Sequence, residues 1–258
     1  MSDSTAQTYE RILAIETATR TQAIALIEGE EVVEHRVRRV VFNHGSSLLE
    51  GIDELLDERT IDLGDIDLFC AGLGPGSFTG LRVGLATAKA LARAVDAPIC
   101  GISSLAALSY SPALINPEAT VVASIDARRR EVYAAAYRWS EGELITVVEE
   151  RATAPSDWID FVDAELQGPL IQVGDGQLRY PALAEWNNPQ LRTLSTDVTP
   201  PSAVGVARLA RHRATTDGPD DLISLEPNYI RPSDAVLPEQ PPKPMPPDPD
   251  EPSPETTE

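Results

Sequence analysis

The chain has 258 residues, of which 42% are hydrophobic, and its formal net charge at pH 7 is −20. That length can bury the core of one large or two smaller domains, whereas the negative charge disfavours independent binding to the phosphate backbone of a nucleic acid. No segment is apolar over the length that spans a bilayer, and residues 1–8 lack the basic and apolar regions of a signal peptide, so we expect a cytoplasmic protein with no membrane partner.

Hydrophobic periodicity predicts an α/β arrangement for the first half of the chain. Three strands come first, and they are followed by a helix capped by Asn43 or Ser46, a strand, a second helix and a last strand. The predicted strands are residues 11–16, 22–28, 31–39, 68–71 and 98–102, and the predicted helices end at residues 59 and 95.

A weaker copy of this opening follows about 110 residues later, which indicates an internal duplication. The apolar run 121–126 repeats the first strand, and the runs 132–137 and 144–149 repeat the hairpin, with the tripeptide Glu-Gly-Glu in both turns. Further helix and strand signals fall at residues 157–166, 170–173 and 202–213. We therefore expect two related lobes, residues 10–110 and 111–236, with a cleft between them.

Residues 237–258 differ from the rest of the chain because they are dominated by proline and acidic side chains. A segment without apolar residues cannot bury a core, so we expect a disordered acidic tail. Cys70 and Cys100 both lie near predicted strand ends and form no Cys-x-x-Cys motif, which predicts buried, reduced thiols.

The glycine-rich turn after residue 71 has two possible roles. Gly74 and Gly76 let the backbone approach a ligand closely, and Ser77 starts a helix whose free N–H groups favour an anion, so the turn is a candidate phosphate cradle. The alternative is a tight connection between a strand and a helix. Along that helix, small residues recur every four positions at 80, 84, 88 and 92, which indicates that another element packs closely there, either a partner helix or the chain's own sheet.

Five sequence runs are specific enough to identify a family. They are I-L-A-I-E-T-A-T at 12–19, N-H-x-S-x-L-L-x-x-I-D-E-L-L at 43–56, G-L-G-P-G-S-F-T-G-L-R-V-G-L-A-T-A-K-A-L-A at 72–92, I-D-A-R-R-R-E-V-Y at 125–133 and E-P-N-Y-I-R at 226–231. In these runs the chain resembles the TsaB (YeaZ) family, from about residue 12 to residue 231. The resemblance implies the duplicated actin-like, sugar-kinase and Hsp70-type fold, which is RNase H-like in each lobe.

The resemblance also implies a function through partners. TsaB proteins support TsaD, the relative that carries the chemistry, in forming the threonylcarbamoyl group on the adenosine next to the anticodon (position 37) of tRNAs that read codons starting with A. It implies the TsaE ATPase as a further partner, a homodimer when the protein is alone, tRNA held by the complex, no cofactor of its own, and ATP or ADP at the interface of the complex. The predicted partner interface consists of Leu48, Leu49, Ile52, Leu56, Gly80, Gly84, Thr87, Ala88 and Leu91.

An ATP-dependent kinase of the same fold is the first alternative. Such kinases place an acidic residue and a glycine in the turn after the first strand of each lobe, but the turns at Glu16 and Asp126 lack the glycine. Thr17, Thr19 and Arg128 remain candidates for binding an anion, with a solvated turn as the other interpretation. The run of arginines at 128–130 suits a phosphate or an acidic partner, or pairs with the chain's own carboxylates.

A metallopeptidase is the second alternative, and the ligands for it are missing. TsaD-like proteins carry His-x-x-x-His on a helix, and the matching positions here fall near Ser104 and Leu108, which cannot replace imidazoles. The three histidines, His35, His44 and His212, lie far apart in the sequence, and no His-Glu-x-x-His motif occurs. We therefore predict that no metal is bound and that the chain is not an enzyme by itself.

Overall fold

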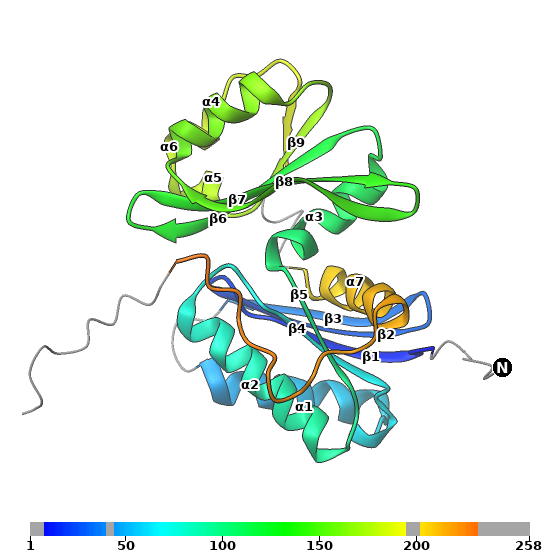
Figure 1. Ribbon diagram of the computed structural model, residues 1–258. Coiled ribbons are helices and arrows are strands. Elements are labelled where there is room, and N and C mark those ends of the chain that lie inside the picture. Colours follow the sequence, from blue (N-terminus) through cyan, green and yellow to red (C-terminus); the bar gives the residue numbers. More distant parts are fainter. Residues whose placement is uncertain (1–7, 40–43, 195–201, 232–258) are drawn as a thin grey trace, which may run out of the picture.

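The computed structural model describes residues 8–39, 44–194 and 202–231, and it consists of two lobes that each contain one five-stranded sheet (Figure 1). The predicted acidic tail at 237–258 lies outside the described residues. Within the part of the chain that is described, no helix is long and apolar enough to cross a membrane.

The first lobe contains the predicted strands and helices, with shifts of one or two residues at their ends. They are β1 (Arg11–Glu16), β2 (Thr21–Glu28), β3 (Glu31–Arg39), α1 (His44–Arg59), the 3₁₀ turn η1 (Leu63–Asp65), β4 (Leu68–Gly72), α2 (Phe78–Ala94) and β5 (Ile99–Ile102). The sheet order is β3-β2-β1-β4-β5, in which β1 pairs antiparallel with β2 and parallel with β4.

The second lobe repeats this topology and confirms the duplicated fold. Its elements are α3 (Ser104–Ile115), β6 (Thr120–Arg128), β7 (Glu131–Ser140), β8 (Glu143–Thr153), α4 (Pro155–Glu165), β9 (Leu170–Val173), α5 (Gly176–Arg179), α6 (Pro181–Ala184), β10 (Leu191–Thr193) and α7 (Ala203–Thr216). The sheet order is β8-β7-β6-β9-β10, so β6 occupies the place of β1, antiparallel to β7 and parallel to β9.

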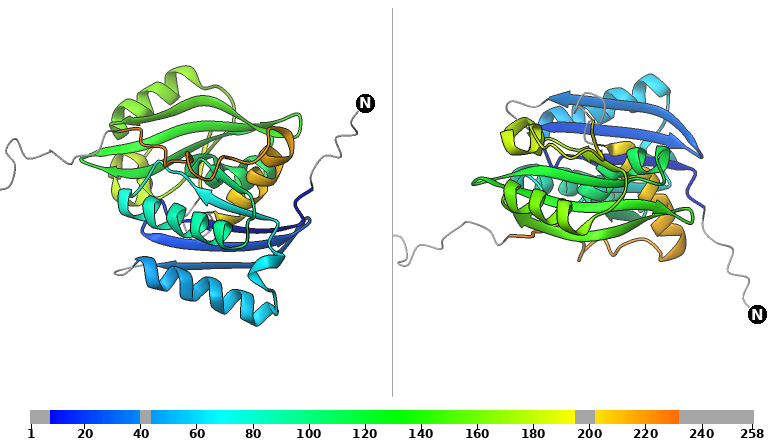
Figure 2. Two further views of the ribbon diagram at one scale, coloured as in Figure 1. Left: turned by 60° about the horizontal axis from the view of Figure 1, so that its bottom comes forward. Right: turned by 90° about the horizontal axis from the view of Figure 1, so that it is seen from above.

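Five layers follow one another through the molecule: α1 with α2, the first sheet, α7 with α3, the second sheet, and then α4 with α5 and α6 (Figures 1 and 2). The two middle helices are exchanged between the lobes. Helix α3 follows the first sheet in the chain but packs on the second, whereas α7 follows the second sheet and packs on the first. The exchange joins the lobes because α3 and α7 also contact each other.

Alternation along β1 explains how the first sheet is covered on both faces. Ile12 and Ala14 pack toward α7, whereas Leu13 and Ile15 pack toward α1 and α2, and all four side chains are buried. A strand that is buried on both sides reads as a continuous apolar run, as this one does in the sequence. The second sheet is covered in the same way by α3 on one face and by α4 and α6 on the other.

Helix α3 and the short elements α5, α6 and β10 are absent from the sequence-based prediction. Helix α3 packs against the second sheet on one side and α7 on the other, so its sequence, S-L-A-A-L-S-Y-S-P-A-L-I, is apolar nearly all round. A helix of this kind lacks the polar stripe that makes amphipathic helices recognisable. The short elements span only three or four residues each, too few for any period to show.

Residues 217–231 form a C-terminal strap that crosses from the first lobe to the second (Figure 1). The backbone N–H of Asn228 donates to the carbonyl of Leu73 at 2.7 Å in the first lobe, and its side-chain amide donates to Glu150 at 2.8 Å in the second. At the end of the strap, Arg231 pairs with Glu131 at 2.6 Å. The strap therefore fixes one side of the cleft between the lobes.

Candidate functional site

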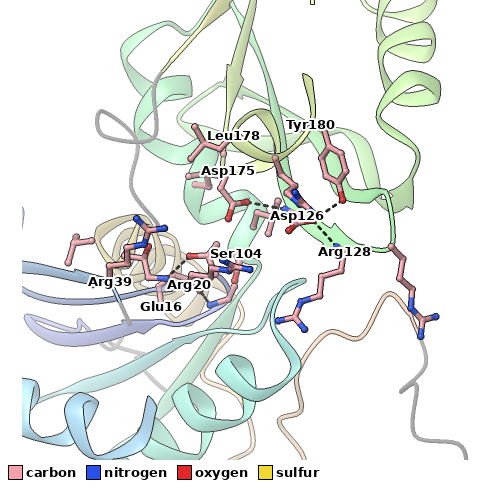
Figure 3. Close-up of a pocket in the computed structure, with 18 of the residues that line it drawn as sticks. Glu16, Arg20, Arg39, Ser104, Asp126, Arg128, Asp175, Leu178 and Tyr180 are labelled. Carbon is pink, nitrogen blue, oxygen red and sulfur yellow. Dashed lines mark hydrogen bonds between the residues drawn. The ribbon is translucent and has the colours of Figure 1, made fainter. Parts of the chain in front are cut away.

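A cavity of about 1290 Å³ lies between the two lobes (Figure 3). The first lobe contributes the turn after β1 and the end of β3, the second lobe contributes the turn after β6 and the start of α5, and α3 contributes the floor between them. The lining residues are Glu16, Ala18, Thr19, Arg20, Thr21, Val37, Arg39, Ser104, Leu108, Ile125, Asp126, Arg128, Arg129, Arg130, Gly174, Asp175, Leu178, Arg179 and Tyr180.

Glu16 is the buried acid on the first-lobe side. Its side chain is 1% exposed and abuts Gly72 on the neighbouring strand, where no side chain would fit beside it. One carboxylate oxygen accepts from the backbone N–H of Ala18 at 2.7 Å, while Oε2 has no hydrogen-bond partner. Burial raises the pKa of Glu16 above its usual value, and the hydrogen bonds from Ala18 and from the Ser104 hydroxyl offset only part of that shift.

Asp126 is the corresponding acid on the second-lobe side, and it is more exposed. Its Oδ1 accepts from the backbone N–H of Arg128 at 2.8 Å and from the hydroxyl of Tyr180 at 2.9 Å, while its own N–H donates to Asp175 at 3.0 Å (Figure 3). Burial and the hydrogen bond to Asp126 raise the pKa of Tyr180 to about 12. Burial also raises the pKa of Asp175, and the nearby charge of Asp126 raises it further. This side of the cavity thus carries two neighbouring carboxylates.

The turn between β6 and β7 is built from three arginines in the left-handed backbone region. Arg128, Arg129 and Arg130 have φ values of 60°, 52° and 65°. Type I′ hairpin turns require such angles and favour Asn-Gly, so a run of arginines here is conformationally costly. All three side chains line the cavity. The turn therefore has an unfavourable backbone conformation and places three positive charges at this edge of the cavity.

The residues predicted to bind an anion separate into two groups. Thr19 and Arg128 line the cavity. The others serve the connection between β4 and α2: Thr17 is buried and its hydroxyl donates to the carbonyl of Gly80 at 2.8 Å, and Gly76 abuts Ala18. Gly74 donates to Ser104 at 3.1 Å, and Ser77 caps α2, accepting from Gly80 at 3.4 Å. Neither glycine nor Ser77 lines the cavity, so this turn has the geometry of a tight strand-to-helix connection.

Ser104 and Leu108 both line the cavity, one turn apart on α3. By sequence, these two positions are expected to match the His-x-x-x-His motif of TsaD-like proteins, and neither side chain supplies an imidazole. Among the described residues, no group of three or more histidine, cysteine, aspartate or glutamate side chains is arranged to hold a metal ion.

The small-residue strip of α2 faces the chain's own first lobe. A Cβ atom at Gly84 would lie well inside 3.0 Å of the Thr17 hydroxyl, and one at Gly80 would lie equally close to the Thr17 carbonyl. Ala88 and Ala92 are fully buried in the core under the sheet. Of the two explanations for the strip, the structure therefore shows close packing on the chain's own strand and turn.

Most of the predicted partner interface is buried for the same reason. The spacing that indicated an interface marks the face of each helix that covers the sheet, because a partner helix and a sheet require the same apolar stripe. Leu49 is half exposed and Leu91 partly buried, whereas the remaining predicted positions pack inside the lobe: Leu48, Ile52, Leu56, Gly80, Gly84, Thr87 and Ala88.

The outer surface of α1 and α2 contains Leu49, Phe78, Thr79, Ala86 and Ala90, all of which are exposed, together with the exposed charged residues Glu50, Asp53, Glu54, Asp57, Glu58, Arg59, Arg82 and Arg93. Thr79, Ala86 and Ala90 share one face of α2 because seven and eleven residues are close to whole numbers of turns. Phe78 and Leu49 keep 39% and 50% of their surface exposed. The uncharged positions of this surface are small or apolar, whereas most of the other exposed positions of the two helices are charged.

Several cavity residues were not predicted from the sequence. Arg20, Arg39 and Arg179 come from three separate elements and meet only because the lobes face each other. Asp175 and Tyr180 belong to the short helices that the sequence analysis missed. The one available signal was the duplication itself, since it placed both turns at the cleft.

Comparison with known proteins finds matches under two names, TsaD and TsaB. A family model described as TsaD, tRNA N6-adenosine threonylcarbamoyltransferase, matches residues 38–185. The tRNA threonylcarbamoyladenosine biosynthesis protein TsaB of Escherichia coli is 30% identical, with 86% of this chain and 94% of that protein covered. The protein of the same name from Haemophilus influenzae is 29% identical, with 85% and 93% covered.

Solved structures agree on the fold. A Pseudomonas aeruginosa protein described as similar to the peptidase YeaZ superposes with a TM-score of 0.73 at 26% identity, covering 86% of this chain and all of that one. The (R)-2-hydroxyglutaryl-CoA dehydratase component A of Acidaminococcus fermentans superposes with a TM-score of 0.53 at 13% identity over 81% of this chain and all of that one. The second likeness concerns the fold alone.

Proposed function

Because the chain belongs to the TsaB (YeaZ) family and acts in tRNA threonylcarbamoyladenosine biosynthesis, we propose that it is a non-catalytic subunit that binds TsaD and supports its activity. The observation that carries the proposal is the packing of the turn after β1 against the start of α2. Thr17 and Ala18 are buried beneath the start of α2, so the backbone that would approach a nucleotide phosphate in a kinase of this fold instead contacts Gly76 and Gly80.

The outer surface of α1 and α2 is the proposed docking surface for TsaD. It lies on the layer farthest from the cleft, so a partner bound there leaves the cavity between the lobes open (Figure 1). Its small side chains, Ala86 and Ala90, let a partner helix approach closely, and its exposed apolar residues, Leu49 and Phe78, supply area to bury.

The remaining partners follow from the same proposal. In the absence of TsaD, the same surface pairs two copies of this chain as a homodimer. TsaE joins the complex as its ATPase, ATP or ADP sits at an interface of the complex, and tRNA is held by the complex because the net charge of this chain repels it. The proposed site of action is the cytoplasm.

Mixing purified components tests the proposal. Threonylcarbamoyl transfer to tRNA is measured with TsaD and TsaE, with and without this chain, and size-exclusion chromatography detects the complex. We expect transfer only in the complete mixture and no turnover of ATP or tRNA by this chain alone. Transfer by this chain without TsaD, or lost with Asp126→Ala in a mixture where the complex still forms, would show that it carries chemistry itself.

A further inference from the structure

Six arginines line the cavity between the lobes of this acidic protein, together with three carboxylic acids, Glu16, Asp126 and Asp175. Several arginines outside the cavity pair with carboxylates, as Arg36 does with Glu58 at 2.5 Å. Within residues 8–39, 44–194 and 202–231, no ion pair involves the cavity arginines Arg20, Arg39, Arg128, Arg130 and Arg179. Against a net charge of −20, this surface is the natural binding place for an anion with several charges.

The end of the C-terminal strap lies beside these arginines. Arg231 pairs with Glu131 and donates to the carbonyl of Ala127, two residues that flank the turn of Arg128, Arg129 and Arg130. The ring of Tyr133 holds the same guanidinium at 5.4 Å. The chain therefore leaves the described structure at the rim of the cavity.

The segment that continues from this point has the complementary charge. Residues 232–258 contain a single basic residue, Lys243, and the acidic residues Asp234, Glu239, Asp248, Asp250, Glu251, Glu255 and Glu258. Asp234 is three residues past Arg231, at most about 10 Å along an extended chain. The acidic group at 248–251 is within about 50–60 Å of Arg231 even at the rise of polyproline II, which is several times the width of the cavity.

We propose that the acidic segment 232–258 docks in the arginine-lined cavity of its own chain. Attachment at the rim gives the segment an effective concentration of about 1 mM at the cavity, so weak contacts suffice to keep it there. Its prolines restrict the unbound chain and thereby reduce the entropy lost on docking. The contact depends on charge and not on apolar burial, and the docked segment occupies the surface that any phosphate-bearing ligand would use.

A spin label on the segment tests the contact in the full-length chain. Cys70 and Cys100 are fully buried, so a nitroxide attached to Ser253→Cys marks the segment selectively, with the unmutated chain as the labelling control. At about 20 mM NaCl we expect at least a two-fold loss of amide signal at Thr19, Gly174 and Tyr180, and recovery of that signal at about 0.5 M NaCl, where charges are screened beyond roughly 4 Å.

Two double variants separate a specific contact from general attraction. The double variant Arg129→Asn with Arg130→Gly removes two cavity charges, and the protein should stay folded because Asn-Gly suits the turn geometry. In the spin-labelled chain, this double variant should restore most of the lost amide signal. Arg138→Ser with Arg192→Ser removes the same charge from exposed positions outside the cavity and should leave the loss unchanged. Signal loss that is absent at low salt, or equal in the two double variants, would overturn the proposal. The result does not depend on TsaD, so it stands or falls separately from the proposed function.

Discussion

The two turns that follow β1 and β6 occupy equivalent places in a duplicated fold, yet they are built in opposite ways. After β1, Thr17 is buried against Gly80 and Ala18 against Gly76, while Thr19 and Arg20 beside them line the cavity. After β6, the backbone runs through three arginines with positive φ, and their side chains face an open cavity. Both turns line the cavity, but the first follows a strand that ends at a buried acid, Glu16, whereas the second presents three exposed arginines. The two copies thus share the position of the turn but not its chemistry.

The largest effect on stability is expected from overpacking the contact between α2 and the turn after β1. Gly84→Ala places a methyl group well inside 3.0 Å of the Thr17 hydroxyl, which is itself held by the Gly80 carbonyl. Alanine favours a helix by about 1 kcal/mol, but overpacking of about 1–3 kcal/mol together with the lost hydrogen bond exceeds this gain. We expect the melting temperature to fall by about 2–10 °C.

Gly51→Ala is the matched control for that variant, because its methyl group would meet only the end of the Ile24 side chain at 3.2 Å. Its melting temperature, measured by calorimetry, should stay the same or rise slightly. Equal destabilisation by the two substitutions would contradict the close packing of α2 on the first turn.

Glu16, the buried acid at the end of β1, is expected to have a smaller effect on stability, and this effect depends on pH. The folded-state pKa of Glu16 is raised above its unfolded value, so the folded chain binds the proton more tightly and Glu16 costs stability as pH rises through that folded pKa. Glu16→Gln should melt higher than the parent chain at pH 7, by about 2–4 °C for each kcal/mol recovered. The difference should disappear as pH falls to the unfolded value, where both states of the parent are protonated.

Melting curves between pH 4 and pH 8 check this prediction. The variant Asp126→Asn, at the equivalent position in β6, is measured for comparison. Asp126→Asn keeps an oxygen that can accept from both the Arg128 N–H and the Tyr180 hydroxyl, and we do not expect it to melt higher than the parent chain. A parent chain whose advantage over Glu16→Gln grows with pH would show that the Glu16 carboxylate is stabilised by a group such as a bound cation.

The smallest effect on stability is expected in the turn between β6 and β7. Arg129→Asn with Arg130→Gly gives the Asn-Gly pair that left-handed turn positions favour, so the strain at φ of 52° and 65° is relieved. The gain should be about 0.5–1 kcal/mol, or about 1–4 °C in melting temperature. Thermal unfolding at about 0.5 M NaCl excludes changes in charge repulsion from the comparison. A lower melting temperature would mean that the arginines hold the turn in place.

The strands and the duplication could be predicted because they depend on local pattern. Each lobe repeats a buried strand, an acidic residue and a hairpin, and the continuous apolar runs of β1 and β6 are visible without knowledge of the partner strands. Helix α3 could not be predicted in this way, since burial on two sides removes the contrast between its faces. The exchange of α3 and α7 between the lobes likewise leaves no local signal.

The candidate site was only partly predictable for a related reason. The sequence identifies Arg128 as a candidate, but Arg20, Arg39 and Arg179 join it through the packing of distant segments. The helical strip shows the limit of periodicity most clearly. Spacing reveals that Gly84 and Ala88 lie on one face of α2, but the same spacing would arise whether that face met a partner or the chain's own sheet.

The docking surface on α2 is tested most directly by two substitutions on opposite faces of that helix. Ala86→Glu adds a charge to the outer surface, whereas Ala88→Leu overfills a fully buried position. Melting temperature and affinity for purified TsaD are measured side by side for both. We predict that Ala86→Glu keeps the parent melting temperature and binds TsaD at least about ten-fold more weakly, a loss of about 1.4 kcal/mol, and that Ala88→Leu melts lower while its folded fraction binds normally. Parent-like binding by Ala86→Glu, together with weakened binding by folded Ala88→Leu, would contradict the account.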